Sequence, residues 1–232
     1  MRMAQRSARQ PKASEQIVDK FWTLLKSNND PMAAWREVHR WWCKEKGHSE
    51  QSWKSASGAA FERIAQQYVQ QLVDADPRLK GQVEIKRWNQ LEQELQEGIL
   101  AEQVWQKGEL RKPVTVPSEV DMVALQVEGE EISRVIAAYS CKSSAAERYQ
   151  QDLFWAERLR GRGIRFCFVT LDEVFLGYAR HGAGKDNKSV RLAMALYDRV
   201  YLFTTEELHH GTAVFQPINN IADDLAKWLE VL

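Results

Sequence analysis

The feature that most constrains the fold is a pair of alternating apolar runs joined by a short turn that contains glycine. Apolar residues alternate from Val120 to Val127 and again from Ile132 to Tyr139, and Gly129 lies between two acidic residues in the connection. Alternation with a period of two residues is typical of strands with one buried face, and glycine favours a tight turn. The segment therefore predicts an antiparallel β-hairpin.

Helical and strand-like patterns alternate after this hairpin. The apolar spacing predicts a helix, a buried strand, a helix, a strand and a final helix over residues 145–159, 164–170, 190–197, 200–203 and 221–232. A charged amphipathic helix is expected before the hairpin, over residues 91–105. We therefore expect an α/β core in which a mixed sheet is flanked by helices.

The N-terminal part of the chain has helical spacing. Asp30 followed by Pro31 is typical of a helix start, and a third helix is expected after Ser57. The tryptophans here lie on apolar faces, which favours burial in a core or dimer interface over base stacking. We divide the chain into a helical N-terminal region, residues 1–56, as a candidate dimerisation region, and a core of residues 57–232.

The composition excludes several classes of protein. The 232 residues carry a formal net charge of +0, so contact with nucleic acid must use local patches. No apolar run approaches the ~20 residues needed to span a bilayer, and the basic N-terminus lacks the apolar segment of a signal peptide. We therefore expect a cytoplasmic protein with no membrane association.

Two further kinds of site are disfavoured by residue spacing. Cys43, Cys141 and Cys167 form no CxxC pair and have no matching histidine spacing, which argues against a zinc site and a disulfide framework. The stretch from Gly182 to Lys185 lacks the earlier glycine and the following hydroxyl residue of a phosphate-binding loop. We therefore expect no nucleotide cofactor.

The hairpin brings together an acid and a lysine. Asp121 opens the first strand and Lys142 follows the second, so an antiparallel pairing places their side chains close to one another. A carboxylate can hold Mg²⁺, and a lysine can orient or deprotonate an attacking water and offset developing negative charge. The pair predicts a hydrolytic metal site, although an acid and a lysine at strand ends are also common on ordinary surfaces.

A family resemblance extends this candidate site. Glu62, in the segment Ser57-Gly58-Ala59-Ala60-Phe61-Glu62, resembles the acid on the helix before the hairpin in PD-(D/E)XK nucleases, where it reaches the metal directly or through water. The alternative is a solvent-facing helical acid. The resemblance covers residues 57–170 and implies a restriction-endonuclease-like core.

The segment after Lys142 resembles a narrower group. Lys142-Ser143-Ser144-Ala145-Ala146-Glu147-Arg148-Tyr149-Gln150-Gln151 is similar to the corresponding segment of restriction endonucleases that read CC:GG sequences, including EcoRII, NgoMIV and the BsaWI-like enzymes. The resemblance implies that Glu147 and Arg148 recognise DNA. Their chemistry fits, because arginine can bond guanine bidentately and glutamate can accept from cytosine.

One departure from the family pattern concerns a metal ligand. Nucleases of this kind usually carry an acid two positions before the lysine, but this chain has Ser140 there. The CC:GG-reading group commonly supplies the acid from the next helix instead, and the corresponding residue here is Trp155. At about 100° per residue, Asp152 lies on the side of Trp155 and interrupts an apolar face, whereas Glu157 points nearly away. Asp152 is therefore the preferred substitute, with Glu157 in reserve.

These patterns lead to one main functional hypothesis. The chain is expected to be a homodimeric type II restriction endonuclease of a restriction-modification system, which cleaves double-stranded DNA at a short CC:GG palindrome with Mg²⁺. The candidate metal ligands are Asp121, Asp152 and Glu62, with Lys142 completing the catalytic set. The alternatives are a repair or recombination nuclease of the same fold and a non-cleaving DNA-binding module.

Overall fold

The computed structural model describes residues 12–102, 105–106, 109–110, 114–115, 120–129, 131–143, 149–183 and 187–231. The chain divides into two compact units, residues 1–60 and residues 61–232. Helix α3 (Glu50–Ala75) contributes residues to both units. None of the described helices is long and apolar enough to cross a membrane.

The first unit is helical, as the sequence predicts. It contains α1 (Ala13–Asn28), α2 (Pro31–Arg40), the π-helical turn η1 (Trp41–Glu45) and the first part of α3. The Asp30 carboxylate accepts a hydrogen bond from the Ala33 amide at 2.8 Å, which confirms the predicted start of α2. Burial of Trp35 and Trp42 agrees with a packing role for these tryptophans.

The prediction that the third helix follows Ser57 was wrong. Helix α3 begins at Glu50, and the Ser49 hydroxyl accepts a hydrogen bond from the Ser52 amide at 3.2 Å. Serine at this position satisfies one of the unpaired amides of the first turn. The start signal was therefore Ser49, and Gly58 is accommodated inside the helix.

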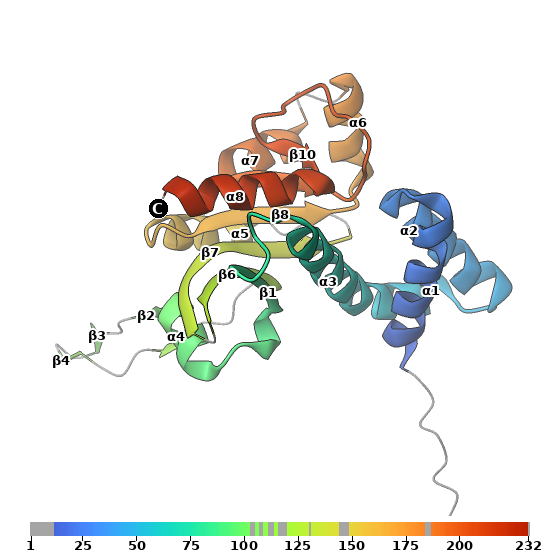
Figure 1. The fold of residues 1–232 in the computed structure, drawn as a ribbon. Coiled ribbons are helices and arrows are strands. Elements are labelled where there is room, and N and C mark those ends of the chain that lie inside the picture. The colour runs from blue at the N-terminus through green and yellow to red at the C-terminus, as the bar shows by residue number, and fades with distance from the viewer. Residues whose placement is uncertain are drawn as a thin grey trace, which may run out of the picture. The chain divides into compact units, whose positions relative to one another are not determined.

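The second unit is built on a mixed sheet in the order β1-β6-β7-β8-β9-β10 (Figure 1). Its strands are β1 (Val83–Arg87), β6 (Met122–Glu128), β7 (Glu131–Lys142), β8 (Arg165–Thr170), β9 (Arg199–Leu202) and β10 (Phe215–Pro217). Strands β1, β6 and β7 pair antiparallel, whereas β7 to β10 run parallel. The predicted hairpin is confirmed, with Gly129 at φ +68° in its turn.

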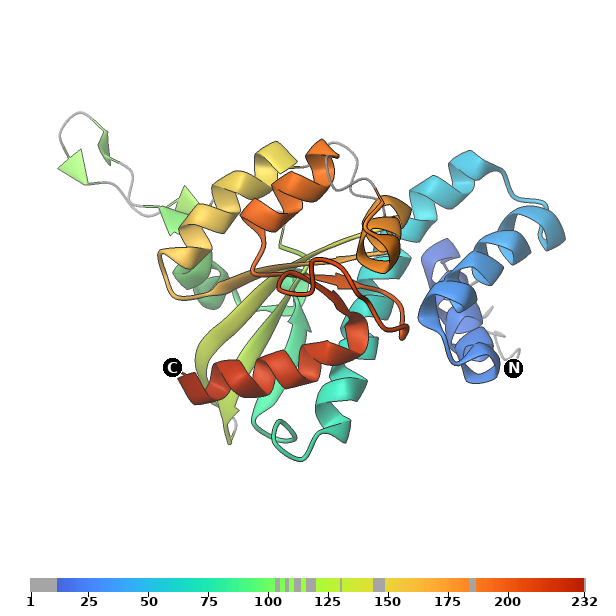
Figure 2. The ribbon, with the colours of Figure 1, turned by 90° about the horizontal axis from the view of Figure 1, so that it is seen from above.

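Helices cover both faces of this sheet. Helices α5 (Tyr149–Arg160) and α7 (Lys188–Leu196) lie on one side, and α8 (Ile221–Val231) lies on the other (Figure 2). The remaining helices are α4 (Gln93–Leu100) and α6 (Glu173–His181), with short turns η2 (Trp88–Gln90) and η3 (Ile218–Asn220). The mixed sheet between helical layers confirms the predicted fold class.

One local prediction differs from the structure, and some elements were not predicted. The helix expected over 91–105 ends at Leu100, because the chain then pairs as β2 (Ala101–Glu102) with β5 (Val114–Thr115). The short strands β3 (Trp105–Gln106) and β4 (Glu109–Leu110) likewise pair with each other in an antiparallel arrangement. Strand β1 and helix α6 were not predicted. In β1 only Val83 and Ile85 are buried, and this short apolar signal is interrupted by charged residues.

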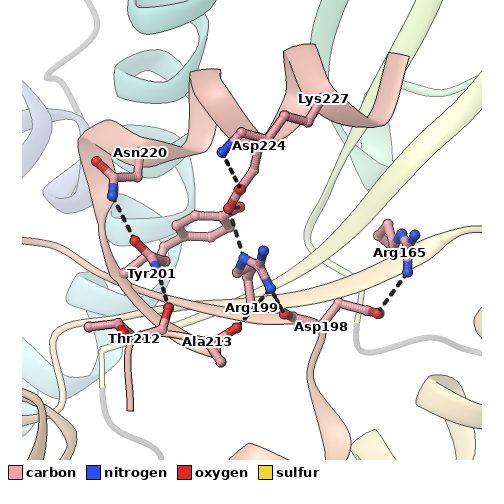
Figure 3. Close-up of polar contacts among 10 residues, drawn as sticks. Arg165, Asp198, Arg199, Tyr201, Thr212, Ala213, Asn220, Asp224 and Lys227 are labelled. Carbon is pink, nitrogen blue, oxygen red and sulfur yellow. Dashed lines mark hydrogen bonds and ion pairs between the residues drawn. The ribbon is translucent and has the colours of Figure 1, made fainter. Parts of the chain in front are cut away.

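A buried carboxylate fastens α8 to the sheet. Asp224 on α8 accepts hydrogen bonds from Arg199 Nε at 2.9 Å and from the Tyr201 hydroxyl at 2.8 Å (Figure 3). Burial raises the pKa of Tyr201 well above its usual value, so this hydroxyl remains a donor. The Tyr201 ring lies 6.4 Å from that of Tyr139 in β7, the strand that ends at Lys142.

Asp224→Ala is expected to lower the free energy of unfolding by about 3 kcal/mol, because it removes the acceptor of Arg199 Nε and of the buried Tyr201 hydroxyl. Urea unfolding measures this change. The matched control is Asp223→Ala, since Asp223 is exposed and its contact with Arg78 is a surface ion pair worth at most about 1 kcal/mol. Equal losses in the two variants would contradict a stabilising role for the buried network.

Candidate active site

The hairpin holds Asp121 and Lys142 in direct contact. Asp121 lies just before β6, where its amide donates to the Tyr139 carbonyl at 2.9 Å and its carbonyl accepts from the Trp88 amide at 2.9 Å. Lys142 Nζ donates to Asp121 Oδ1 at 2.9 Å and to Oδ2 at 2.7 Å. The Cys141 amide donates to Oδ2 at 2.6 Å. The aspartate is therefore fixed by main-chain contacts with strand β7 and with the turn η2 that follows β1.

Glu62 on α3 completes a cluster with this pair. Its Oε1 atom lies 3.9 Å from Lys142 Nζ. Burial, and then the negative charge of Asp121, raise the pKa of Glu62 to about 7, although Lys142 and Arg87 act in the opposite direction. Burial lowers the pKa of Lys142, but Asp121 and Glu62 outweigh that effect and raise it. The lysine is therefore cationic between two carboxylates.

The donor set of this cluster fits a divalent cation. Burial is the main cause of the raised pKa of Glu62, and the nearby negative charge of Asp121 adds to it, so ionising both carboxylates together is unfavourable without a compensating cation. Hard cations such as Mg²⁺ bind carboxylate oxygens and compensate such charge. Asp121 and Glu62 are therefore the residues of this cluster that could hold a metal.

The side chains of α3 also explain where Glu62 lies. Gln66 Nε2 donates to the Ile85 carbonyl at 2.8 Å, and the Ile85 amide donates to Gln70 Oε1 at 2.7 Å. Ile85 belongs to β1, the edge strand of the sheet, whose outer main-chain groups would otherwise lack a partner. Glu62, Gln66 and Gln70 follow one another at single-turn spacing, so the glutamines anchor the helix face that carries Glu62.

Gln66→Ala is expected to reduce DNA cleavage by about 10- to 100-fold, because a small displacement of Glu62 disturbs the cluster. Cleavage rates are compared with those of Gln71→Ala, which alters an exposed residue of the same helix. In a Glu62→Gln background, Gln66→Ala should add little, since both changes act through the same carboxylate. Additive losses would instead indicate that Gln66 only stabilises the fold.

Asp152, the acid expected to replace the one missing at position 140, is more deeply buried than Asp121 and Glu62. It is 1% exposed and its Oδ2 accepts a hydrogen bond from the Tyr197 hydroxyl. Within the described parts of the chain, no group of three potential metal ligands includes Asp121, Glu62 or Asp152. Glu157, the reserve acid, is exposed, and Trp155 is buried.

Ser140 and Asp152 nevertheless belong to the same side of the sheet. Ser140 pairs in register with Phe168 of β8, and the Phe168 ring stacks on Tyr197 at a centroid distance of 5.1 Å. Tyr197 in turn contacts Asp152. The buried Ser140 hydroxyl has no hydrogen-bond partner among the described residues. Ser140 and Lys142 share this face because side chains alternate along a strand.

The expected DNA-reading residues, Glu147 and Arg148, lie outside the described residues. In the sequence they fall between Lys142, where β7 ends, and Tyr149, where α5 begins. Their role therefore stays a prediction.

The arrangement of the sheet and its helices is that of restriction endonucleases. The structure is similar to a crystal structure of the specific restriction endonuclease AgeI–DNA complex, with a TM-score of 0.59, 14% sequence identity and coverage of 96% of this chain and 86% of that chain. A crystal structure of the pre-specific restriction endonuclease BsaWI–DNA complex gives a TM-score of 0.47 and 14% identity over 93% of this chain and 82% of that chain.

The sequence comparison supplies the family. The model of the BsaWI restriction endonuclease type 2 family matches residues 105–226, and the chain belongs to this family. It is therefore a site-specific endodeoxyribonuclease of the type II restriction class, as the sequence analysis predicted. No curated protein matches the chain.

Proposed function

We propose that the protein cleaves double-stranded DNA at a short palindrome containing CC:GG, that it requires Mg²⁺ and that it acts as a homodimer. The observation that carries the proposal is the cluster of Glu62, Asp121 and Lys142 at the end of the hairpin. The DNA bound to the similar restriction endonuclease AgeI supports DNA as the substrate. A palindromic target is matched by a two-fold symmetric protein.

The candidate catalytic residues have distinct proposed roles. Glu62, Asp121 and Asp152 would hold the metal, which would supply Lewis-acid activation of the phosphate and of the attacking water. Lys142 orients the attacking water and offsets the negative charge that develops on the phosphate. Asp121, through its two contacts with the ammonium group, keeps Lys142 in position for this role.

Cleavage of plasmid DNA with and without Mg²⁺ tests this proposal. Discrete fragments that appear only with the metal, and whose sequenced ends share a CC:GG site, are the expected result. Metal-dependent cutting without sequence preference would favour a repair or recombination nuclease. DNA binding without cutting would favour a non-cleaving module, for which the serine at position 140 is the supporting observation. Sedimentation equilibrium measures the oligomeric state.

Arg148→Ala and Glu147→Ala are expected to lose discrimination between cognate and non-cognate duplexes, because each specific base contact contributes about 1–3 kcal/mol. Binding constants for the two duplexes, measured over a range of salt concentrations, give this difference. Equal weakening on every sequence, with a shallower salt dependence, would identify Arg148 as a phosphate contact instead.

A further inference from the structure

A second cluster of potential metal ligands belongs to the first unit, whereas Glu62, Asp121 and Lys142 belong to the second. His39 belongs to α2, Cys43 to the π-helical turn η1, and Glu50 is the first residue of α3. One ligand atom from each of the three lies within 4.8 Å of the other two. His39 Nε2 lies 3.2 Å from Glu50 Oε1 and 3.1 Å from Oε2.

The local structure holds these three side chains on one side of the helix. His39 and Cys43 are one turn apart, and residues at this spacing project from the same helical face and can bind one metal. The imidazole ring packs against Trp53, with centroids 4.9 Å apart, which limits the orientations available to Nε2. Lys46 N donates to the Trp41 carbonyl at 3.0 Å, and this wider turn surrounds Cys43. Such π-turns frequently mark functional sites.

An ordinary ion pair accounts poorly for the whole cluster. The His39 and Glu50 side chains are 41% and 65% exposed, and an ion pair at such a position contributes little to stability. The Cys43 thiol also approaches the Glu50 carboxylate, so three different types of ligand converge on one point. An imidazole nitrogen, a thiolate sulfur and a carboxylate oxygen are together typical of zinc sites.

We propose that His39, Cys43 and Glu50 bind Zn²⁺, with water or another exchangeable ligand completing the coordination. This site is separate from the Glu62–Asp121–Lys142 cluster, whose oxygen ligands suit a harder cation. The zinc links the α2–η1 segment to the beginning of α3 and so fixes the fold of the first unit. The cysteine spacing argued against a zinc site, and the proposal differs from that expectation because its ligands are one histidine, one cysteine and a glutamate from the next helix.

Cobalt substitution tests the proposal directly. The whole chain, first stripped of metal with a chelator, is titrated with Co²⁺ and then with Zn²⁺. We expect a thiolate-to-cobalt charge-transfer band that saturates at one metal per chain, is displaced by Zn²⁺ and is lost in Cys43→Ser. An oxygen-only site cannot give this band, so metal bound at Asp121 and Glu62 does not interfere; the band should persist in Asp121→Asn.

Matched variants separate ligation from general effects on the helices. His39→Gln and Glu50→Gln should weaken Zn²⁺ binding by more than about tenfold, since each removes one of the protein ligands. His48→Gln and Glu45→Gln, which alter exposed neighbours outside the cluster, should bind as the wild type does. A charge-transfer band that survives Cys43→Ser, or wild-type Zn²⁺ affinity in His39→Gln, would overturn the assignment whatever the outcome of the DNA cleavage assays.

Discussion

Replacing Lys142 with alanine should reduce DNA cleavage by at least about 100-fold while leaving specific DNA binding largely intact, because the change removes a charge that acts on the hydrolytic step. The ammonium group contacts both oxygens of Asp121 and approaches Glu62, so the substitution removes the cation that is in direct contact with Asp121. Single-turnover cleavage and binding to an uncleaved duplex measure the two properties separately. Asp121→Ala should lose cleavage in the same way.

The control for this experiment is Lys86→Ala on strand β1. Lys86 pairs with Glu84 at 3.0 Å and contributes no described contact to Asp121 or Glu62. It should cleave at a rate close to that of the wild type. Near-normal cleavage by Lys142→Ala would remove the central residue of the proposed active site, and thermal unfolding of the same samples shows whether any loss reflects misfolding.

The central hairpin was predictable because its information is local. Alternating burial fixes which residues of β6 and β7 face the core, and the turn at Gly129 fixes how the strands return. Once the strands pair, Asp121 must lie near the end of the following strand, where Lys142 is found. The contact between these two side chains therefore follows from a short stretch of sequence.

Other parts of the structure depend on contacts between distant segments. Strand β1 has only a brief apolar signal, and its outer edge is completed by Gln66 and Gln70 from α3. Glutamines on a helix carry no pattern that distinguishes sheet-edge partners from solvent-exposed residues. The His39–Cys43–Glu50 cluster was missed for a related reason, since a loop separates the first two residues from the third.

Identifying the acid that replaces the one missing at position 140 requires both local sequence patterns and contacts between distant segments. The helical spacing predicted that Asp152 would need a polar partner inside an apolar face, and the structure identifies the Tyr197 hydroxyl as one such partner. This contact can serve two different purposes. It can orient a metal-binding carboxylate, as outer partners of metal ligands commonly do, or it can simply satisfy a buried acid within the fold.

Asp152→Asn should suppress Mg²⁺-dependent cleavage by orders of magnitude if Asp152 is the third metal ligand, since an uncharged amide is a poor ligand for a hard cation. Glu157→Gln should remain active, because Glu157 is exposed. Tyr197→Phe is the decisive comparison: it removes the hydroxyl contact but keeps the carboxylate, and should retain far more cleavage than Asp152→Asn. Cleavage is measured across a range of Mg²⁺ concentrations, together with urea unfolding of each variant.

Equal losses of stability and of cleavage in Asp152→Asn and Tyr197→Phe, with no change in Mg²⁺ requirement, would make Asp152 a structural residue of α5. An inactive Glu157→Gln beside a normal Asp152→Asn would assign the missing ligand to Glu157 instead.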